Sequence, residues 1–164
     1  MCDILLAGAT GYIGSAVAMA LVEKGYKVLC PVRQMPKAPL NGVIYQLCDC
    51  TDTVALKQLA QRFSGIEAII SCIASRTGGR QDAWLVDYRA NMTLLETAQE
   101  LAIERFILLS AICVQKPRLE FQHAKRAFEQ KLQASGLTYS IVRPTAFFKS
   151  LAGQVEKVKA GKAF

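Results

Sequence analysis

Three glycines near the start of the chain, Gly8, Gly11 and Gly14, constrain its fold more than any other feature. The apolar run Ile4–Ala7 precedes them and predicts a buried strand, and the Ala-rich run Ser15–Lys24 follows them and predicts a helix. Between a strand and a helix, this spacing is typical of a turn that binds a dinucleotide. Gly8 would make the tight turn, Gly11 would let a diphosphate approach the backbone, and Gly14 would let the helix pack closely on the sheet. The alternative is a turn that only connects the two elements.

Short apolar runs alternate with helical periodicity along the rest of the chain. This pattern predicts an α/β fold, a Rossmann-type doubly wound parallel sheet with helices on both faces. We expect strands at Asp3–Ala7, Lys27–Val32, Val43–Leu47, Ala68–Cys72, Arg105–Ser110 and Thr138–Val142. We expect helices at Tyr12–Lys24, Thr53–Phe63, Ala83–Leu101, Gln122–Ala134 and Leu151–Lys159. Ligands bind beyond the carboxyl ends of the strands in such sheets, so the loops there are the candidate site.

Composition limits the class of protein. The 164 residues are 52% hydrophobic and 20% charged, which predicts one globular domain, and no apolar run approaches the roughly 20 residues of a membrane span. No signal peptide opens the sequence, so we expect a cytoplasmic protein, or an organelle protein that has lost its transit peptide. No metal site is expected, because the only close cysteine pair, Cys48 and Cys50, has no second pair of ligands and His123 stands alone.

The net charge of +7 comes entirely from residues 116–164, which hold ten basic and three acidic residues. Such a surface could attract nucleic acid, an anionic membrane or an anionic small substrate, or be matched by an acidic surface that this sequence lacks. No nucleic-acid motif and no basic stripe with interleaved aromatic residues is present, so nucleic acid is not an expected partner.

The end of the second strand bears on the choice of nucleotide. A site for NAD usually has an acidic residue there, on the ribose 2′-hydroxyl, but this strand ends in Arg33. A guanidinium can pair with a 2′-phosphate, with help from Lys37, so the sequence favours NADPH. Asp49, after the third strand, could accept a hydrogen bond from the adenine amino group. For both Arg33 and Asp49 the alternative is an ordinary surface or turn residue.

Several stretches together resemble one enzyme family. They are Gly8–Gly14, Ser71–Gly79, Leu109–Pro117, Leu119–Gln122 and Tyr139–Ser150. They resemble the divinyl chlorophyllide a 8-vinyl reductases, which are atypical members of the extended short-chain dehydrogenase/reductase superfamily. The resemblance spans nearly all of the sequence and implies NADPH-dependent reduction of the 8-vinyl group of a Mg-bearing divinyl (proto)chlorophyllide to ethyl, in chlorophyll biosynthesis.

The resemblance also implies roles for particular residues. Cofactor contacts are expected from Gly8, Thr10, Gly11, Tyr12, Ile13, Gly14, Arg33, Asp49, Cys72, Ala74 and Lys125. Substrate-pocket residues are expected to be Phe121, Pro144, Phe147 and Phe148, of which the last two could stack on a flat macrocycle. The loop from Arg76 to Arg80 is a weaker candidate, equally well explained as a solvated loop.

One departure from the wider superfamily concerns the expected catalytic residues, Lys125 and Ser110. Typical members carry a Tyr-x-x-x-Lys motif, whereas Phe121 stands at the tyrosine position here and Lys125 remains. A phenol can protonate a carbonyl oxygen and Phe cannot, which favours reduction of a carbon–carbon double bond over alcohol–ketone chemistry. Lys125 would orient the nicotinamide ribose, and Ser110 would line the pocket beside the nicotinamide.

Members of the resembled family continue well past 164 residues. We therefore expect this chain to be the N-terminal, nucleotide-binding portion of a longer reductase that lacks its C-terminal substrate lobe. The resemblance implies a bacterial cytoplasmic or thylakoid-peripheral location, or a chloroplast one with a plastid-targeting sequence, and it leaves the oligomeric state open. Two alternatives remain: a non-catalytic NADP(H)-sensing regulator, and another NADPH-dependent C=C or quinone reductase.

Overall fold

The computed structural model of the chain describes residues 2–145, 147 and 155–161. Its strands are β1 (Ile4–Ala7), β2 (Val28–Val32), β3 (Val43–Leu47), β4 (Ala68–Ser71), β5 (Arg105–Leu109) and β6 (Thr138–Val142). Its helices are α1 (Tyr12–Glu23), α2 (Thr53–Gln61), α3 (Arg80–Ala83), the π-helical segment η1 (Trp84–Ala90), α4 (Asn91–Glu100), α5 (Glu120–Gln133) and α7 (Val155–Lys159).

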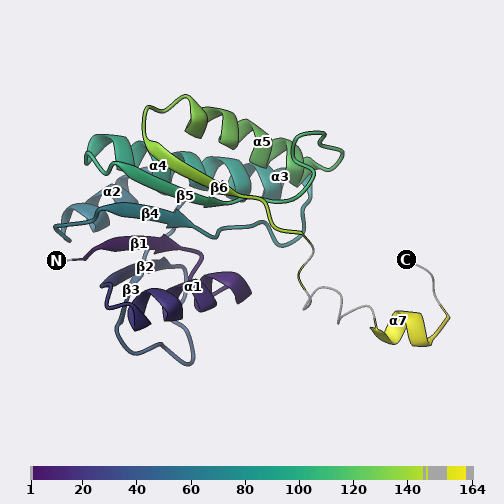
Figure 1. The fold of residues 1–164 in the computed structure, drawn as a ribbon, viewed down its shortest axis with the longest axis horizontal. Helices are drawn as coiled ribbons and strands as arrows, with labels where there is room; N and C mark the ends of the chain where they lie inside the picture. Colours follow the sequence, from purple (N-terminus) through teal and green to yellow (C-terminus); the bar gives the residue numbers. More distant parts are fainter. Residues whose placement is uncertain (1, 146, 148–154, 162–164) are drawn as a thin grey trace.

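The six strands form one parallel sheet in the order β3-β2-β1-β4-β5-β6 (Figure 1). From β1 the chain runs outward through β2 and β3, then returns to β4 on the other side of β1 and runs outward through β5 and β6. Ile4 pairs with Ala68 and Ala7 with Ser71, so the order reverses between β1 and β4. Crevices at such a reversal are where ligands bind in doubly wound sheets.

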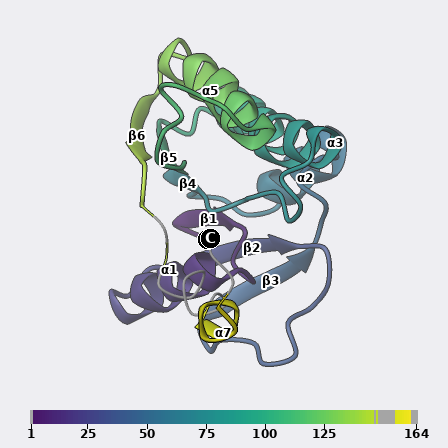
Figure 2. The same cartoon turned by 90° about the vertical axis from the view of Figure 1, so that its right-hand side faces the viewer.

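Helices cover the two faces of the sheet unequally (Figure 2). One core lies beneath α1 and includes Leu6, Ala18 and Val28. The larger core joins the other face to α2, α4 and α5 and includes Phe106 and Phe128. Every residue of β1 and β2 is buried, which explains why these central strands are continuous apolar runs. The predicted Rossmann-type sheet is confirmed.

The long helix expected over Ala83–Leu101 is wrong in its details. Helical structure begins at Arg80, and the seven residues Trp84–Ala90 form a π-helix before α4 continues to Glu100. A π segment widens the helix and leaves backbone carbonyls without their usual partners. The Asn91 side chain compensates, because its Nδ2 donates to the carbonyl oxygens of Val86 (3.4 Å) and Asp87 (3.0 Å).

The other predicted elements agree with the structure to within two residues at each described end. Asp52 caps α2 as predicted, its Oδ1 accepting from the Ala55 amide at 3.0 Å. The helix expected over Leu151–Lys159 is described only from Val155 onward. Within the described part of the chain, no helix is long and apolar enough to cross a membrane.

Candidate functional site

A cleft of about 410 Å³ opens at the carboxyl ends of the central strands. Its walls come from the glycine loop, the ends of β2, β3 and β4, and the segment η1. The lining residues are Gly8, Thr10, Gly11, Tyr12, Ile13, Gly14, Pro31, Val32, Arg33, Cys48, Asp49, Cys50, Thr51, Cys72, Ile73, Ala74, Arg76, Leu85, Val86, Ala90, Leu109 and Phe147. The cleft thus unites every expected cofactor residue except Lys125.

The glycine loop forms the floor of this cleft, and close contacts explain its composition. Gly8 has a φ of +85°, and a Cβ there would lie 2.7 Å from the carbonyl carbon of Cys72. A Cβ on Gly14 would lie 2.1 Å from the carbonyl oxygen of Gly8, closer than any real contact. A Cβ on Gly11 would meet that oxygen at 3.3 Å, which the loop alone nearly tolerates. The fold therefore requires glycine at positions 8 and 14. At position 11 the fold alone nearly tolerates a side chain, so glycine there is explained better by a ligand that approaches the loop.

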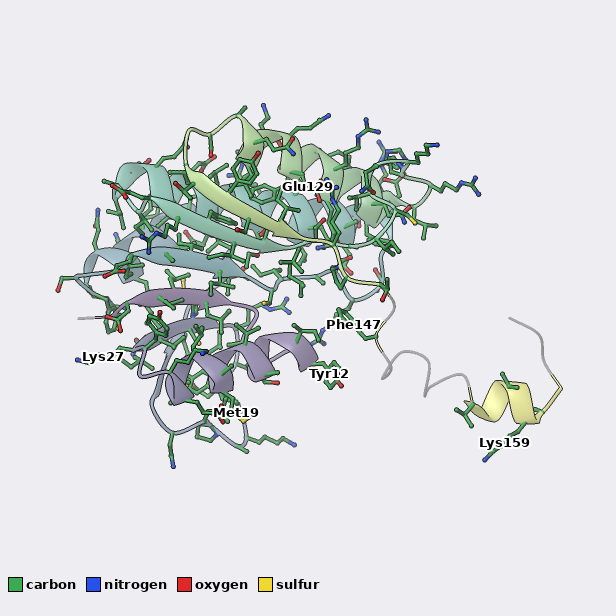
Figure 3. All side chains as sticks on the ribbon, viewed as in Figure 1. Tyr12, Met19, Lys27, Glu129, Phe147 and Lys159 are labelled. Atoms are coloured by element: carbon green, nitrogen blue, oxygen red, sulfur yellow. The ribbon has the colours of Figure 1, made fainter. Side chains whose placement is uncertain are left out.

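The N-terminus of α1 faces the same cleft. Gly11 is its N-cap residue and offers no side-chain acceptor to the first-turn amides. Figure 3 shows Tyr12 and Phe147 at this end of α1, and both line the cleft. Backbone amides and a positive dipole end directed at a cavity form a suitable site for a diphosphate.

Arg33 and Asp49 line the cleft from the ends of β2 and β3, and both are exposed. Asp49 Oδ1 accepts from the amide and the hydroxyl of Thr51, each at 2.8 Å, which fixes the orientation of the carboxylate. No carboxylate among the described residues lies within 4.0 Å of the Arg33 guanidinium. This corner of the cleft therefore combines an oriented acceptor with an unpaired cation.

Three thiols also line the cleft. Burial raises the pKa of Cys72 to about 11 and that of Cys50 to about 12, and burial also raises the pKa of Cys48. All six cysteines are free, and Cys113 is exposed on the loop after β5. These cleft thiols stay protonated near neutral pH and contribute an apolar wall.

Lys125 and Ser110 lie behind the cleft wall. The Lys125 ammonium lies 3.0 Å from Asp87 Oδ1, and it donates to the carbonyl oxygens of Ile73 (3.4 Å) and Leu109 (3.5 Å). The side chains of Lys125 and Asp87 are 5% and 0% exposed. Lys125 is therefore a buried residue that joins α5 to η1 and to the ends of β4 and β5.

Two buried polar atoms beside this ion pair have no partner among the described residues. They are Asp87 Oδ2 and Ser110 Oγ. Leaving such an atom unpaired costs about 1–3 kcal/mol, so these atoms mark a place where a polar group can be received. Sequence reasoning missed Asp87, although its position on the buried face of a helix, four residues after Ala83, was a signal.

The expected substrate-pocket residues are only partly brought together. Phe147 lines the cleft, and Phe148 lies outside the described residues. Phe121 and Pro144 are half-buried and are not among the lining residues. A Cβ on Gly78 would lie 3.7 Å from the Phe121 ring, so this ring lies beside the loop after β4. The Pro144 carbonyl accepts from the Ile112 amide at 3.0 Å.

The sequence matches the NAD(P)H-binding family over residues 8–164. The chain belongs to this family. A curated relative of this NAD(P)H-binding chain, divinyl chlorophyllide a 8-vinyl-reductase, chloroplastic, from Oryza sativa subsp. indica, is 46% identical over 98% of the chain and 44% of its own length. The photosystem II assembly factor Ycf39 of Cyanophora paradoxa is 30% identical over 93% of the chain and 48% of its own length. The chain thus spans less than half the length of these relatives.

Solved structures agree with the family assignment at the level of the fold. The crystal structure of the Bordetella bronchiseptica enzyme WbmG in complex with NAD matches with a TM-score of 0.79 and 15% identity. The match covers 99% of this NAD(P)H-binding chain and 61% of that enzyme.

Proposed function

We propose that the protein carrying this chain uses NADPH to reduce the 8-vinyl group of divinyl (proto)chlorophyllide a to an ethyl group, as a step of chlorophyll biosynthesis. The observation that carries the proposal is the 46% identity over 98% of the chain to the rice relative with that name. The chain would be the N-terminal, nucleotide-binding portion, and the chloroplastic name of the relative supports a chloroplast location.

The residues of the cleft fit the proposed cofactor. The tight Gly8–Gly14 contact and the uncapped start of α1 would receive the diphosphate. The Asp49 carboxylate, oriented by Thr51, would accept from the adenine amino group. Arg33, with no acidic residue beside it at the end of β2, would select a 2′-phosphate and hence NADPH over NADH. Thr10, Tyr12, Ile13, Cys72 and Ala74 would complete the contacts.

Bound NADPH would supply a hydride to one carbon of the vinyl group, and the conjugated macrocycle can delocalise the charge that results. Because Phe121 has no hydroxyl, the second vinyl carbon would take its proton from water or from another group. Lys125, held by Asp87, would orient the nicotinamide ribose from behind the wall. The unpaired hydroxyl of Ser110 would lie behind the wall at the nicotinamide end, while Phe147 would contact the flat face of the pigment. The role of Phe148 stays a prediction from the sequence.

A second candidate function is that of a non-catalytic NADP(H)-dependent factor. The observation in its favour is the 30% identity to Ycf39 of Cyanophora paradoxa, a protein named as an assembly factor. Phe121 is compatible with this function, since no proton donor is needed. A third candidate, another NADPH-dependent C=C or quinone reductase, differs only in its substrate.

The test is turnover of the pigment by the protein at its natural length. It would be incubated with NADPH and divinyl chlorophyllide a, with the Soret band followed and the products separated by chromatography. We expect the 8-ethyl pigment to form in proportion to NADPH consumed. Binding of NADPH without pigment turnover would instead favour the non-catalytic factor, and turnover of a quinone or enone alone would favour the third candidate.

A further inference from the structure

The loop between β4 and α3 is held in one shape by a single carboxylate. Asp82 Oδ2 accepts from the Arg76 amide (2.9 Å), the Thr77 amide (2.8 Å) and the Thr77 hydroxyl (2.9 Å). The Thr77 hydroxyl also accepts from the Gly79 amide at 3.2 Å. The solvated flexible loop considered from the sequence would need no such fixation, so the structure gives this loop a defined conformation.

The loop has two further neighbours. The Phe121 ring lies beside it at Gly78. The Ser75 amide donates to Asp87 Oδ1 at 3.4 Å, so the start of the loop shares its anchor with Lys125. These attachments fix the backbone from which the Arg76 side chain projects, and Arg76 lines the cleft.

Arg33 lines the same cleft as Arg76 of this loop. The amide and hydroxyl of Thr77, and to a lesser extent the Arg76 amide and the charge of Arg33, hold the pKa of Asp82 below its ordinary value. The two guanidiniums thus line one cleft, from the end of β2 and from the loop after β4. Neither has a carboxylate partner within 4.0 Å among the described residues. Two arginines without an ion-pair partner at one cavity form a site for a dianion, because each guanidinium remains available for a charge-assisted hydrogen bond.

We infer that Arg76 and Arg33 together bind the 2′-phosphate of the adenosine half of NADPH, with the Asp82-held loop as the second wall of that subsite. The inference rests on the proposed use of NADPH. Arg76 would then help to distinguish NADPH from NADH. The 2′-phosphate of NADPH can pair with a guanidinium, whereas the 2′-hydroxyl of NADH carries no charge to pair with. Two guanidiniums from separate elements would also surround the phosphate instead of approaching it from one side.

The test uses ligand fragments that differ only in this phosphate. Binding of 2′,5′-ADP and of 5′-ADP to the protein would be measured by isothermal titration calorimetry, for the unaltered protein and for Arg76→Ala, Arg33→Ala and Arg80→Ala. Arg80 is the matched control, because it is an exposed arginine four residues away that does not line the cleft. All three variants change exposed side chains, so they are expected to fold, and circular dichroism would verify this.

We expect Arg76→Ala and Arg33→Ala each to weaken 2′,5′-ADP by about tenfold or more, and to change 5′-ADP by less than about threefold. Arg80→Ala should change neither. Loss of 2′,5′-ADP affinity in Arg33→Ala but not in Arg76→Ala would overturn the inference and leave the proposed function standing. An equal loss for both fragments in Arg76→Ala would also overturn it. Selective loss in both variants would support it even if the pigment were not reduced.

Discussion

Breaking the ion pair between Lys125 and Asp87 should destabilise the fold far more than breaking an ion pair at the surface. The pair is almost completely buried, and Lys125 also donates to two strand-end carbonyl groups. Replacing Lys125 with Met keeps most of the aliphatic stem but leaves a carboxylate in the interior without its counter-ion. Leaving one partner of a buried pair unpaired typically costs about 3–5 kcal/mol. A domain of this size has about 5–15 kcal/mol of stability in total, so the loss would be a large fraction of it.

A matched control is available in Lys57 and Glu100. This pair has an even shorter contact, 2.5 Å, but its side chains are 23% and 57% exposed. Surface pairs contribute about 0–1 kcal/mol, so Lys57→Met should have a small effect despite the shorter distance. Burial, not distance, would then account for the difference between the two lysines.

The assay is urea unfolding followed by circular dichroism, with thermal unfolding as a second probe. Lys125→Met should lower the melting temperature by about 6–20 °C, as expected from about 3–5 kcal/mol in a domain of this length. The double variant Lys125→Met/Asp87→Leu should be more stable than Lys125→Met alone, because it removes both charges together. The reasoning is refuted if Lys125→Met costs no more than Lys57→Met, or if the two changes in the double variant simply add.

Further predictions concern the glycine loop, the thiols and a helix cap. Gly14→Ala should cost at least about 1–3 kcal/mol of unfolding free energy, because its Cβ meets backbone at 2.1 Å, whereas Gly11→Ala should keep most of the stability but lose nucleotide affinity; denaturation and NADPH titration would separate them. Iodoacetamide at pH 8 should alkylate exposed Cys113 well before Cys72, as mass spectrometry can follow. The raised pKa of Cys72 contributes stability that is fully present below pH 9 and is lost as the pH rises through about 11, and Cys72→Ala should flatten that decline. Asp52→Ala should cost about 1 kcal/mol in urea unfolding through loss of the α2 cap.

The fold could be predicted from the sequence because local signals agreed with one another. Buried parallel strands such as β1 and β2 are continuous apolar runs, and Asp52 marks a helix start by its chemistry alone. The glycine spacing also reflects a backbone contact that lies beyond the turn itself. Gly8 and Gly14 contact each other through the backbone, which only glycine permits.

The parts that could not be predicted depend on contacts between distant segments. The ion pair between Lys125 and Asp87 could not be predicted, because the two residues are 38 positions apart in the chain and no periodicity links them. A π turn was equally hidden, because apolar spacing along Trp84–Ala90 does not distinguish it from an ordinary helix. Leu85, Val86 and Ala90 of this segment line the cleft, and no sequence motif marks them. Phe121 stands at the tyrosine position by its spacing, yet its ring lies beside the loop at Gly78 and does not line the cleft.

The π segment also has a consequence for how this gene can change. A wide turn of this kind accommodates an additional residue within an otherwise α-helical stretch, and Asn91 supplies the hydrogen bonds that this residue disturbs. Deleting one residue from Trp84–Ala90 would restore ordinary helical winding, and the segments on either side would keep their orientation because the wide turn had taken up the residue removed. The shortened helix would still pack on the sheet, but the residues inside the wide turn, which include Leu85 and Val86 of the cleft wall, would be repositioned. A single-codon deletion in this segment could therefore leave a folded protein that has a changed wall at its nucleotide site.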